Sequence, residues 1–259
     1  MTKTEIGYST VTLPTKGALY DGAIPGGKVK VRRMTVNELT RLSQGGSPLD
    51  KIEGILKSTV QLPDGITLAE LLITDRFYLL LAVRTASFGG EYDFRYKCQF
   101  CGETGRETID ISEDLQTRSG GVEMDDGSGK MVVEEPVDVP LKDAECVVQI
   151  RFLRGKDERS VFKHSKRMKM QGMDKGDTSE AYRLGLHIES LDGEEFTNAL
   201  EKQEWVRNIT AADCLRLERA IEKAEPGVDL SVFPECNGCG ALNEQDLPFD
   251  AEFFRPSRL

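Results

Sequence analysis

Two Cys-x-x-Cys knuckles constrain this chain more than any other feature of its sequence. The first contains Cys98 and Cys101, the second contains Cys236 and Cys239, and each is followed at once by a glycine. A tight loop of this kind aims two sulfurs at one point, and the glycine permits the positive φ that brings backbone N–H groups close to them. One knuckle supplies half of a tetrahedral site. The two knuckles together therefore predict one structural zinc site with four thiolate ligands.

The residues on either side predict that each knuckle forms the tip of a β-hairpin. Residues 91–96 alternate polar and aromatic side chains before the first knuckle, and residues 107–111 alternate again after it. The second knuckle has similar runs at 228–233 and 245–249. Alternation with a period of two is typical of strands. Two hairpins tipped by cysteines predict a zinc ribbon whose halves are separated by a long insertion.

A redox dithiol and a pair of disulfides are the competing interpretations of the knuckles. A redox motif is expected in a thioredoxin-like context of strand and helix, which neither knuckle has. Residues 1–5 lead into no apolar signal segment. Six cysteines without a secretory signal indicate a reducing compartment, where thiolates bind metal. The remaining cysteines, Cys146 and Cys214, share faces with apolar residues and are expected to be core thiols.

The pattern of the whole chain predicts an α+β protein in three parts. Residues 1–90 form an N-terminal β-hairpin and a helical platform. Residues 91–118 and 226–259 form the split zinc ribbon, and residues 119–225 form an inserted β-hairpin and a helix-rich region. The aromatic tail at 249–256 is expected either to fold back on the ribbon or to dock on a neighbour.

Capping residues and apolar spacing predict the helices. Thr35 opens a short helix with a capping box to Glu38, and Ser47 caps a second helix with Pro48 in its first turn. Further helices are predicted at 67–72, from a Thr74 cap through 87, at 155–170, from 178 onward, at 198–208 and after a Thr210 cap.

The composition favours protein partners over nucleic acid or membrane. The 259 residues include no apolar run approaching the ~20 that a membrane span needs. The net charge of −10 disfavours a phosphate backbone as the main partner, because that affinity comes from clustered Lys and Arg. Residues 155–170 are the one basic helix that could contact nucleic acid, and a charged, solvated face is the preferred interpretation.

Catalytic groupings are absent from the sequence pattern, so the chain is predicted not to be an enzyme. Its two histidines stand in unrelated contexts, with His164 expected at the surface and His187 in or beside the core. The acidic, glycine-rich residues 119–130 do not have the spacing of an EF-hand loop. They predict a solvated hairpin tip, and neither a calcium site nor a hydrolase site.

Several stretches of the chain, taken in order, carry a family resemblance. They are residues 13–20, 31–35, 75–76, 79–84, 87–92, 153–158, 227–229 and 253–254. Together they resemble baseplate hub proteins of contractile-tailed phages, the group typified by a T-even phage hub subunit. The resemblance implies a non-catalytic structural or assembly role in the tail baseplate, in a virion assembled in the host cytoplasm. It also implies other tail and hub proteins as partners, and a possible homo-oligomer that follows tail symmetry.

A zinc-ribbon regulator that binds nucleic acid is the alternative function. It predicts basic and aromatic residues around the knuckles. Lys97 and Arg106 are present there, but four glutamates offset them, at positions 103, 107, 235 and 244. The structural role is therefore preferred.

Overall fold

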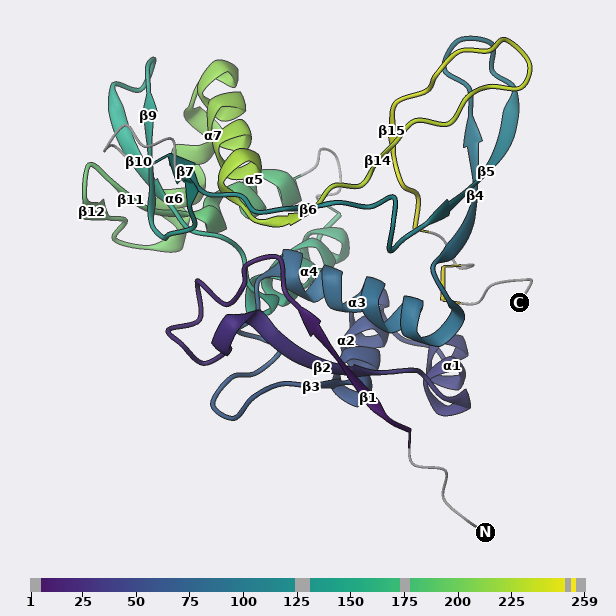
Figure 1. Cartoon of the computed structure of the whole chain (residues 1–259). Helices are drawn as coiled ribbons and strands as arrows, with labels where there is room; N and C mark the ends of the chain where they lie inside the picture. The colour runs from purple at the N-terminus through teal and green to yellow at the C-terminus, as the bar shows by residue number, and fades with distance from the viewer. Residues whose placement is uncertain (1–5, 124–130, 173–177, 250–252, 255–259) are drawn as a thin grey trace.

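The computed structural model describes residues 6–123, 131–172, 178–249 and 253–254. Most of the predicted acidic loop, residues 124–130, lies outside them. The described residues fold as a mixed α/β protein with seven α-helices and several small sheets (Figure 1). The helices are α1 Val36–Ser43, α2 Pro48–Thr59, α3 Ile73–Phe88, α4 Gly155–Met170, α5 Thr178–His187, α6 Ala199–Asn208 and α7 Ala211–Ala224.

The strands are short and pair in antiparallel fashion. They are β1 Tyr8–Thr12, β2 Lys28–Arg32, β3 Val60–Gln61, β4 Glu91–Lys97, β5 Thr104–Asp110, β6 Thr117–Arg118, β7 Val122–Glu123, β8 Met131–Val132, β9 Val137–Leu141, β10 Cys146–Ile150, β11 Ile188–Leu191, β12 Glu194–Glu195, β13 Gly227–Val228, β14 Ser231–Val232 and β15 Gln245–Asp246. One sheet has the order β1-β2-β3 and another the order β12-β11-β10-β9. The other pairs are β4 with β5, β14 with β15, β13 with β6, and β7 with β8.

Three predicted helix caps are confirmed. The Thr35 side chain accepts a hydrogen bond in a capping box at the start of α1. The hydroxyl of Ser47 accepts the N–H of Asp50 at 3.1 Å and opens α2. The hydroxyl of Thr210 caps α7 in the same way. A capping oxygen satisfies an N–H that the first turn leaves unpaired, so these helix starts follow from local sequence.

The predicted helix at residues 67–72 is wrong, because this segment forms turns. Hydrogen bonds to the first residues of the distant helix α4 keep this segment out of a helix. The N–H of Gly155 bonds to the carbonyl of Leu71 at 2.9 Å, and the N–H of Lys156 bonds to that of Ala69 at 2.9 Å. Tertiary hydrogen bonds have overridden helix propensity here.

The predicted Thr74 cap is also wrong. Helix α3 begins at Ile73, its cap residue is Leu72, and no side chain bonds to its first turn. The N–H of Ile73 is satisfied by the carbonyl of Leu153 at 2.9 Å, so the first turn has a tertiary partner in place of a cap. Thr74 lies inside the helix, where its buried hydroxyl has no partner among the described residues.

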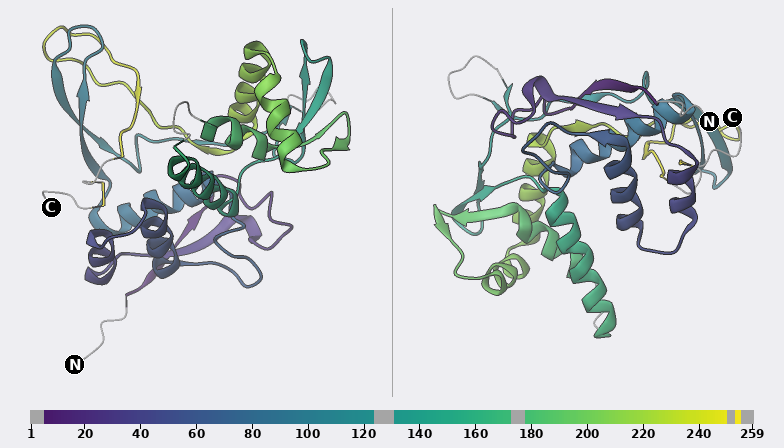
Figure 2. Two further views of the ribbon diagram at one scale, coloured as in Figure 1. Left: turned by 180° about the vertical axis from the view of Figure 1, so that it is seen from behind. Right: turned by 90° about the horizontal axis from the view of Figure 1, so that it is seen from below.

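Buried apolar side chains gather in two clusters. The larger cluster draws on the N-terminal strands, α2 and α3 together with β9, β10 and α7. The smaller cluster belongs to a projecting element, which we call the arm and define as residues 91–111 and 228–249 (Figures 1 and 2). Its buried residues are Tyr92, Phe94, Tyr96, Ile109, Ile111, Val232 and Leu247, packed with Leu81 and Phe253. The arm therefore has a small core of its own, anchored on α3.

Phe253 and Phe254 fold back on the arm, which is one of the two positions predicted for the aromatic tail. Phe253 is buried, and its ring meets that of Tyr92 edge-on at 5.3 Å. The guanidinium of Arg84, at the end of α3, lies 5.9 Å from the centre of the Phe253 ring. Edge-on aromatic contacts and a cation over a ring are both stabilising, so Phe253 is held at the base of the arm.

The two histidines are both buried. His187 bonds through Nδ1 to the carbonyl of Arg151 at 2.9 Å, as its predicted core position requires. The predicted surface position of His164 is wrong, because Tyr182 of α5 stacks on its ring at 4.1 Å between centroids. The predicted basic helix is present as α4, and its second half extends away from the rest of the molecule (Figure 2).

Candidate metal centre

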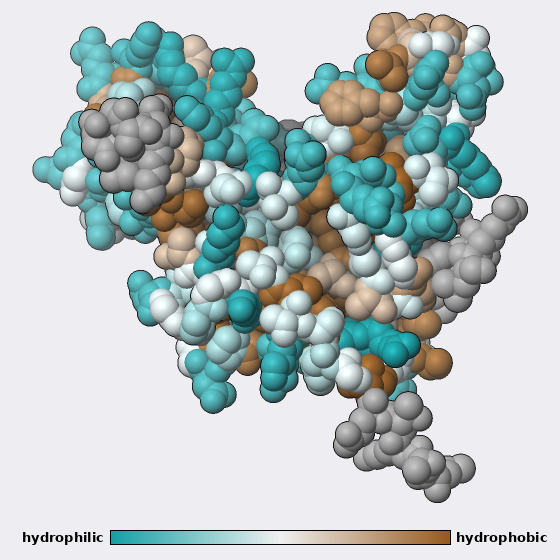
Figure 3. Space-filling model, viewed as in Figure 1, coloured by the Kyte–Doolittle hydropathy of each residue, from teal (hydrophilic) through white to brown (hydrophobic). Residues whose placement is uncertain are grey.

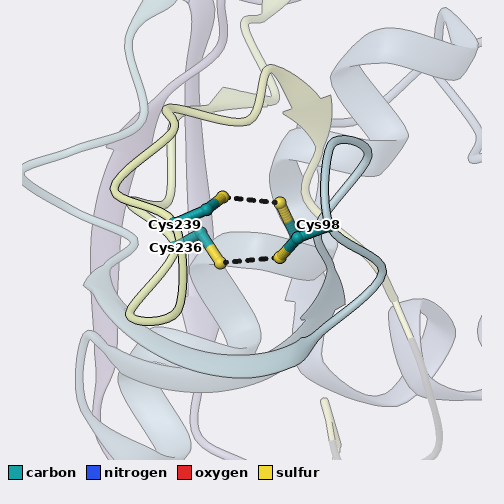
Figure 4. Close-up of side chains that lie close together, drawn as sticks. Cys98, Cys236 and Cys239 are labelled. Atoms are coloured by element: carbon teal, nitrogen blue, oxygen red, sulfur yellow. Dashed lines mark hydrogen bonds between the residues drawn. The ribbon is translucent and has the colours of Figure 1, made fainter.

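The four knuckle cysteines meet at the end of the arm. The Sγ atoms of Cys98 and Cys239 lie 3.7 Å apart, and those of Cys101 and Cys236 lie 3.6 Å apart (Figure 4). All four sulfurs lie within 4.8 Å of one another. The fold brings two loops that are far apart in the sequence to one point, and these four side chains could together bind a metal ion.

The two knuckles share one local backbone arrangement. The N–H of Cys98 bonds to the carbonyl five residues on at 2.8 Å, and that of Cys236 does so at 2.9 Å. The N–H of Gly102 returns to the carbonyl of Cys98 at 3.0 Å, and that of Gly240 returns to the carbonyl of Cys236 at 2.7 Å. Both glycines have positive φ, 77° and 71°, which side chains disfavour. The glycines are therefore required by the turn that aims the sulfurs.

The site is half-open to solvent in a symmetrical way. Cys98 and Cys236, the first cysteine of each knuckle, are buried, whereas Cys101 and Cys239 are exposed. All six cysteines of the chain are free thiols in the structure. The site thus has two sulfurs against the core of the arm and two at its surface.

Electrostatics at the site favour the thiolate of Cys98 and disfavour that of Cys101. The backbone N–H groups of Cys101 and Phe100 lower the pKa of the Cys98 thiol to about 6, against the effect of burial. The backbone N–H of Glu103 lowers the pKa of Cys101, but the neighbouring thiols and burial outweigh it and raise the value to about 12. Four thiolates side by side repel one another, so a full set of them needs a cation.

Asn243 is a residue of the site that sequence reasoning missed. Its side chain is buried, its oxygen accepts the N–H of Gln99 at 2.9 Å, and its amide donates to the carbonyl of Ala241 at 3.0 Å. The amide also lies 3.3 Å from the carbonyl of Pro234. One side chain therefore joins the first knuckle to both sides of the second. An asparagine shortly after a knuckle carries no sequence signal for this role.

Two tyrosines of β4 add further links between the halves of the arm. The hydroxyl of Tyr96 donates to the carbonyl of Glu235 at 2.7 Å, and the hydroxyl of Tyr92 donates to the carbonyl of Pro248 at 2.7 Å. The alternating pattern of residues 91–96 predicted a strand, and the structure places its aromatic rings in the core of the arm. The pattern gave no indication of their backbone partners.

The other two cysteines lie away from this site. Cys146 is in β10 and Cys214 is in α7, and both pack partly buried against the larger apolar cluster. The predicted core position of these two thiols is confirmed only in part, because they pack against the core without being fully buried. The described residues contain one group of metal-ligand side chains of this kind, formed by the four knuckle cysteines.

The fold and the site together define a mixed α/β protein with a projecting arm whose end gathers four cysteines. The sequence model of the family described as T4 bacteriophage base plate protein matches residues 7–255, and the chain belongs to this family. Comparisons with curated proteins and with solved structures gave no match.

Family membership gives the chain a structural role in a phage baseplate, in the virion tail and beside other tail proteins. It points to a structural role in preference to an enzymatic one, and it gives no support to the alternative of a nucleic-acid-binding regulator. In the described part of the chain, none of the helices has both the length and the apolar character that crossing a membrane requires.

Proposed function

We propose that the chain is a subunit of the hub region of a contractile-tail baseplate, and that its arm is a zinc ribbon closed by Cys98, Cys101, Cys236 and Cys239. Family membership supports the baseplate role. The hub position rests on the ordered stretches that resemble hub proteins. The role is structural, and the chain carries out no catalysis.

The meeting of four sulfurs is the observation that carries the zinc assignment. Zinc binds four thiolates tetrahedrally with Zn–S distances of about 2.3 Å, and the edge of such a tetrahedron is about 3.8 Å. Two of the Sγ–Sγ distances between the knuckles, 3.7 and 3.6 Å, fit that edge. A thiolate-only donor set suits zinc better than the oxygen-seeking cations calcium and magnesium. The residues present therefore fit this metal.

Zinc would add to the hydrogen bonds and the small core that join the two halves of the arm. Its two halves are joined through more than a hundred intervening residues, and its apolar core is small. A structural zinc site has a closed shell with no position left for water, and its binding energy adds directly to folding. The metal would let the arm stay rigid during tail assembly and contraction.

Several finer points of organisation belong to the same proposal. The chain divides into residues 1–90, the ribbon of 91–118 with 226–259, and the insertion of 119–225. The number of copies follows the symmetry of the tail. Assembly takes place in the host cytoplasm, where a reducing environment keeps the four thiols available for metal.

Metal analysis of the purified protein tests the zinc site. We expect one equivalent of zinc per chain, with Cys146 and Cys214 as the thiols that react readily. After a chelator removes the metal, all six cysteines should react. Less than half an equivalent of zinc, together with six reactive thiols from the start, would show that the site does not hold this metal.

Mass spectrometry of purified virions tests the baseplate position independently. Cross-linking before digestion should connect this chain to hub and tube proteins. Cross-links confined to the periphery of the baseplate would contradict the hub assignment and leave the zinc site untouched.

A further inference from the structure

Strand β1 has an open edge. It pairs with β2 on one side, and no described strand pairs with its other side. An unpaired edge presents a row of backbone donors and acceptors that another chain can extend. Proteins often cover such edges or interrupt them with proline, and β1 (Tyr8–Thr12) contains no proline. The edge is available for strand addition.

The pairing register shows which backbone groups are free on this edge. Leu13 donates its N–H to the carbonyl of Gly27 at 2.9 Å, in the same register that pairs Val11 with Val29. Hydrogen-bonded pairs alternate along an antiparallel ladder. The N–H groups of Thr10 and Thr12 therefore face away from β2, toward the open edge.

A groove of about 480 Å³, lined by both apolar and polar side chains, lies beside this edge. Val11 and Val31 of the sheet form one wall, Leu81 and Ala82 of α3 form the floor, and residues 111–117 form the other wall. Figure 1 shows that residues 111–117 and β1 both pass close to α3, and Figure 3 shows apolar surface on this face. A strand added to β1 would direct every second side chain into the groove.

The opposite face of the same hairpin is basic. Lys28 and Lys30 are exposed on β2, and neither forms an ion pair with any residue that the structure describes. They stand out in a chain whose net charge is −10. Side chains of an added strand that point away from the groove would lie on the face of these lysines. Acidic residues at those positions would be attracted to them.

We propose that an extended segment of another protein adds as a strand to the open edge of β1, with small apolar residues facing the groove and acidic residues between them. Backbone hydrogen bonds to Thr10 and Thr12 give affinity, and the groove and the lysines select the alternating side chains. This strand-binding site is separate from the cysteines of the arm, so the proposal does not depend on whether the arm binds zinc.

Peptide binding to the full-length protein tests this proposal. The probes are two fluorescent peptides, one that alternates valine with glutamate and one that alternates valine with lysine. We expect the glutamate peptide to bind more tightly in fluorescence anisotropy. In amide exchange measured by NMR, the N–H groups of Thr10 and Thr12 should gain protection, while those of Ser9 and Val11 should stay as protected as before because β2 already satisfies them.

Thr10→Pro is the decisive variant. Proline is tolerated on an edge strand where its missing N–H faces outward, so β1 should still pair with β2, while the added strand loses a donor and meets the ring. We expect the affinity for the glutamate peptide to fall about tenfold or more, the equivalent of one good hydrogen bond. Thr10→Ala, which keeps the N–H, is the matched control and should bind like the unaltered protein.

A charge variant keeps the test decisive if Thr10→Pro does not fold. Lys28→Glu combined with Lys30→Glu should weaken binding of the glutamate peptide and improve binding of the lysine peptide. Equal affinity of Thr10→Pro and Thr10→Ala, equal affinity for the two peptides, or no binding of either would overturn the proposal. So would a dimer of the protein alone that Thr10→Pro makes monomeric, since the occupant would then be a second copy.

Discussion

The hydroxyl of Tyr96 donates a 2.7 Å hydrogen bond to the backbone carbonyl of Glu235, the residue that directly precedes Cys236. The Tyr96 ring also covers Gly105 on the paired strand β5, where a Cβ atom would lie 2.4 Å from the ring. This one side chain thus contacts both strands of the first hairpin and the start of the second knuckle. Contacts within the protein thus hold the two halves of the arm in place without help from a metal.

Tyr96→Phe should lower the free energy of unfolding by about 1 kcal/mol, since the ring stays in place and one buried hydrogen bond is lost. Urea unfolding followed by circular dichroism measures the change. Tyr8→Phe on β1 is the matched control. Tyr8 is exposed, and surface changes of this kind stay within about 0.5 kcal/mol. Equal stabilities for the two variants would contradict a role for the Tyr96 hydroxyl.

Cys236→Ser should abolish zinc binding, because three thiolates no longer close the coordination shell. Metal content is the primary measurement. Amide exchange over β4 and β5 should also become faster, because the metal no longer stabilises the arm. Cys146→Ser, which changes a cysteine of β10 outside the cluster, should keep one equivalent of zinc. A full equivalent of zinc in Cys236→Ser would rule out the proposed ligand set.

Features that depend on neighbouring residues along the chain could be predicted from the sequence. The alternation of residues 91–96 gave the strand β4, and the hydroxyl-bearing residues Thr35, Ser47 and Thr210 gave three helix starts. The knuckles are features of this kind too, because each loop is closed by its own backbone hydrogen bonds. Their meeting was inferred from chemistry, since half a tetrahedral site needs a complement.

Features that depend on distant segments could not be predicted in the same way. His164 is buried because the ring of Tyr182, in helix α5, stacks on it. The sequence of residues 155–170 gives no sign of this contact. Residues 67–72 are kept out of a helix by backbone hydrogen bonds from Gly155 and Lys156 at the start of α4. Asn243 matters because its partner Gln99 comes from the other half of the arm. Each of these contacts exists only once the fold has brought its partners together.

Tyr20 and Asp75 make a buried hydrogen bond that should contribute strongly to the stability of the N-terminal part. The Tyr20 hydroxyl donates to the Asp75 carboxylate at 2.5 Å and accepts the N–H of Leu72 at 3.0 Å. Thr15 also donates its hydroxyl to Asp75, at 2.7 Å. Burial raises the pKa of Asp75, against these hydrogen bonds, and the side chain is fully buried. Tyr20→Phe therefore leaves two buried polar groups short of a partner.

We expect Tyr20→Phe to lower the free energy of unfolding by roughly 2–6 kcal/mol, since each of the two unsatisfied buried groups costs about 1–3 kcal/mol. A double-mutant cycle with Asp75→Ala, measured by urea unfolding, isolates the contact. The two changes should be less than additive, because residues in direct contact couple. Strict additivity would show that the Tyr20 hydroxyl and the Asp75 carboxylate do not depend on each other.

His187 and Glu225 line one cavity of about 340 Å³ and should oppose each other in the pH dependence of stability. Burial lowers the pKa of His187 to about 4, so between about 6.5 and 4 the unfolded chain binds its proton more readily. Protonation of His187 therefore lowers the free energy of unfolding as pH falls, by up to about 3 kcal/mol. Burial raises the pKa of Glu225 to about 7, so the folded chain binds that proton more readily. Loss of the proton from Glu225 therefore lowers the free energy of unfolding as pH rises from about 4.5 to 7.

Single substitutions should separate the two slopes. Relative to the unaltered protein, His187→Gln should show a free energy of unfolding that falls more steeply as pH rises from about 4.5 to 7. The reason is that the titration of His187 no longer offsets the loss of the proton from Glu225. Glu225→Gln should show the reverse, a free energy of unfolding that falls more steeply as pH drops from about 6.5 to 4. Urea unfolding at a series of pH values measures both. If each variant kept the pH profile of the unaltered protein, neither group would titrate differently on folding, and the opposition inferred from their shared cavity would be wrong.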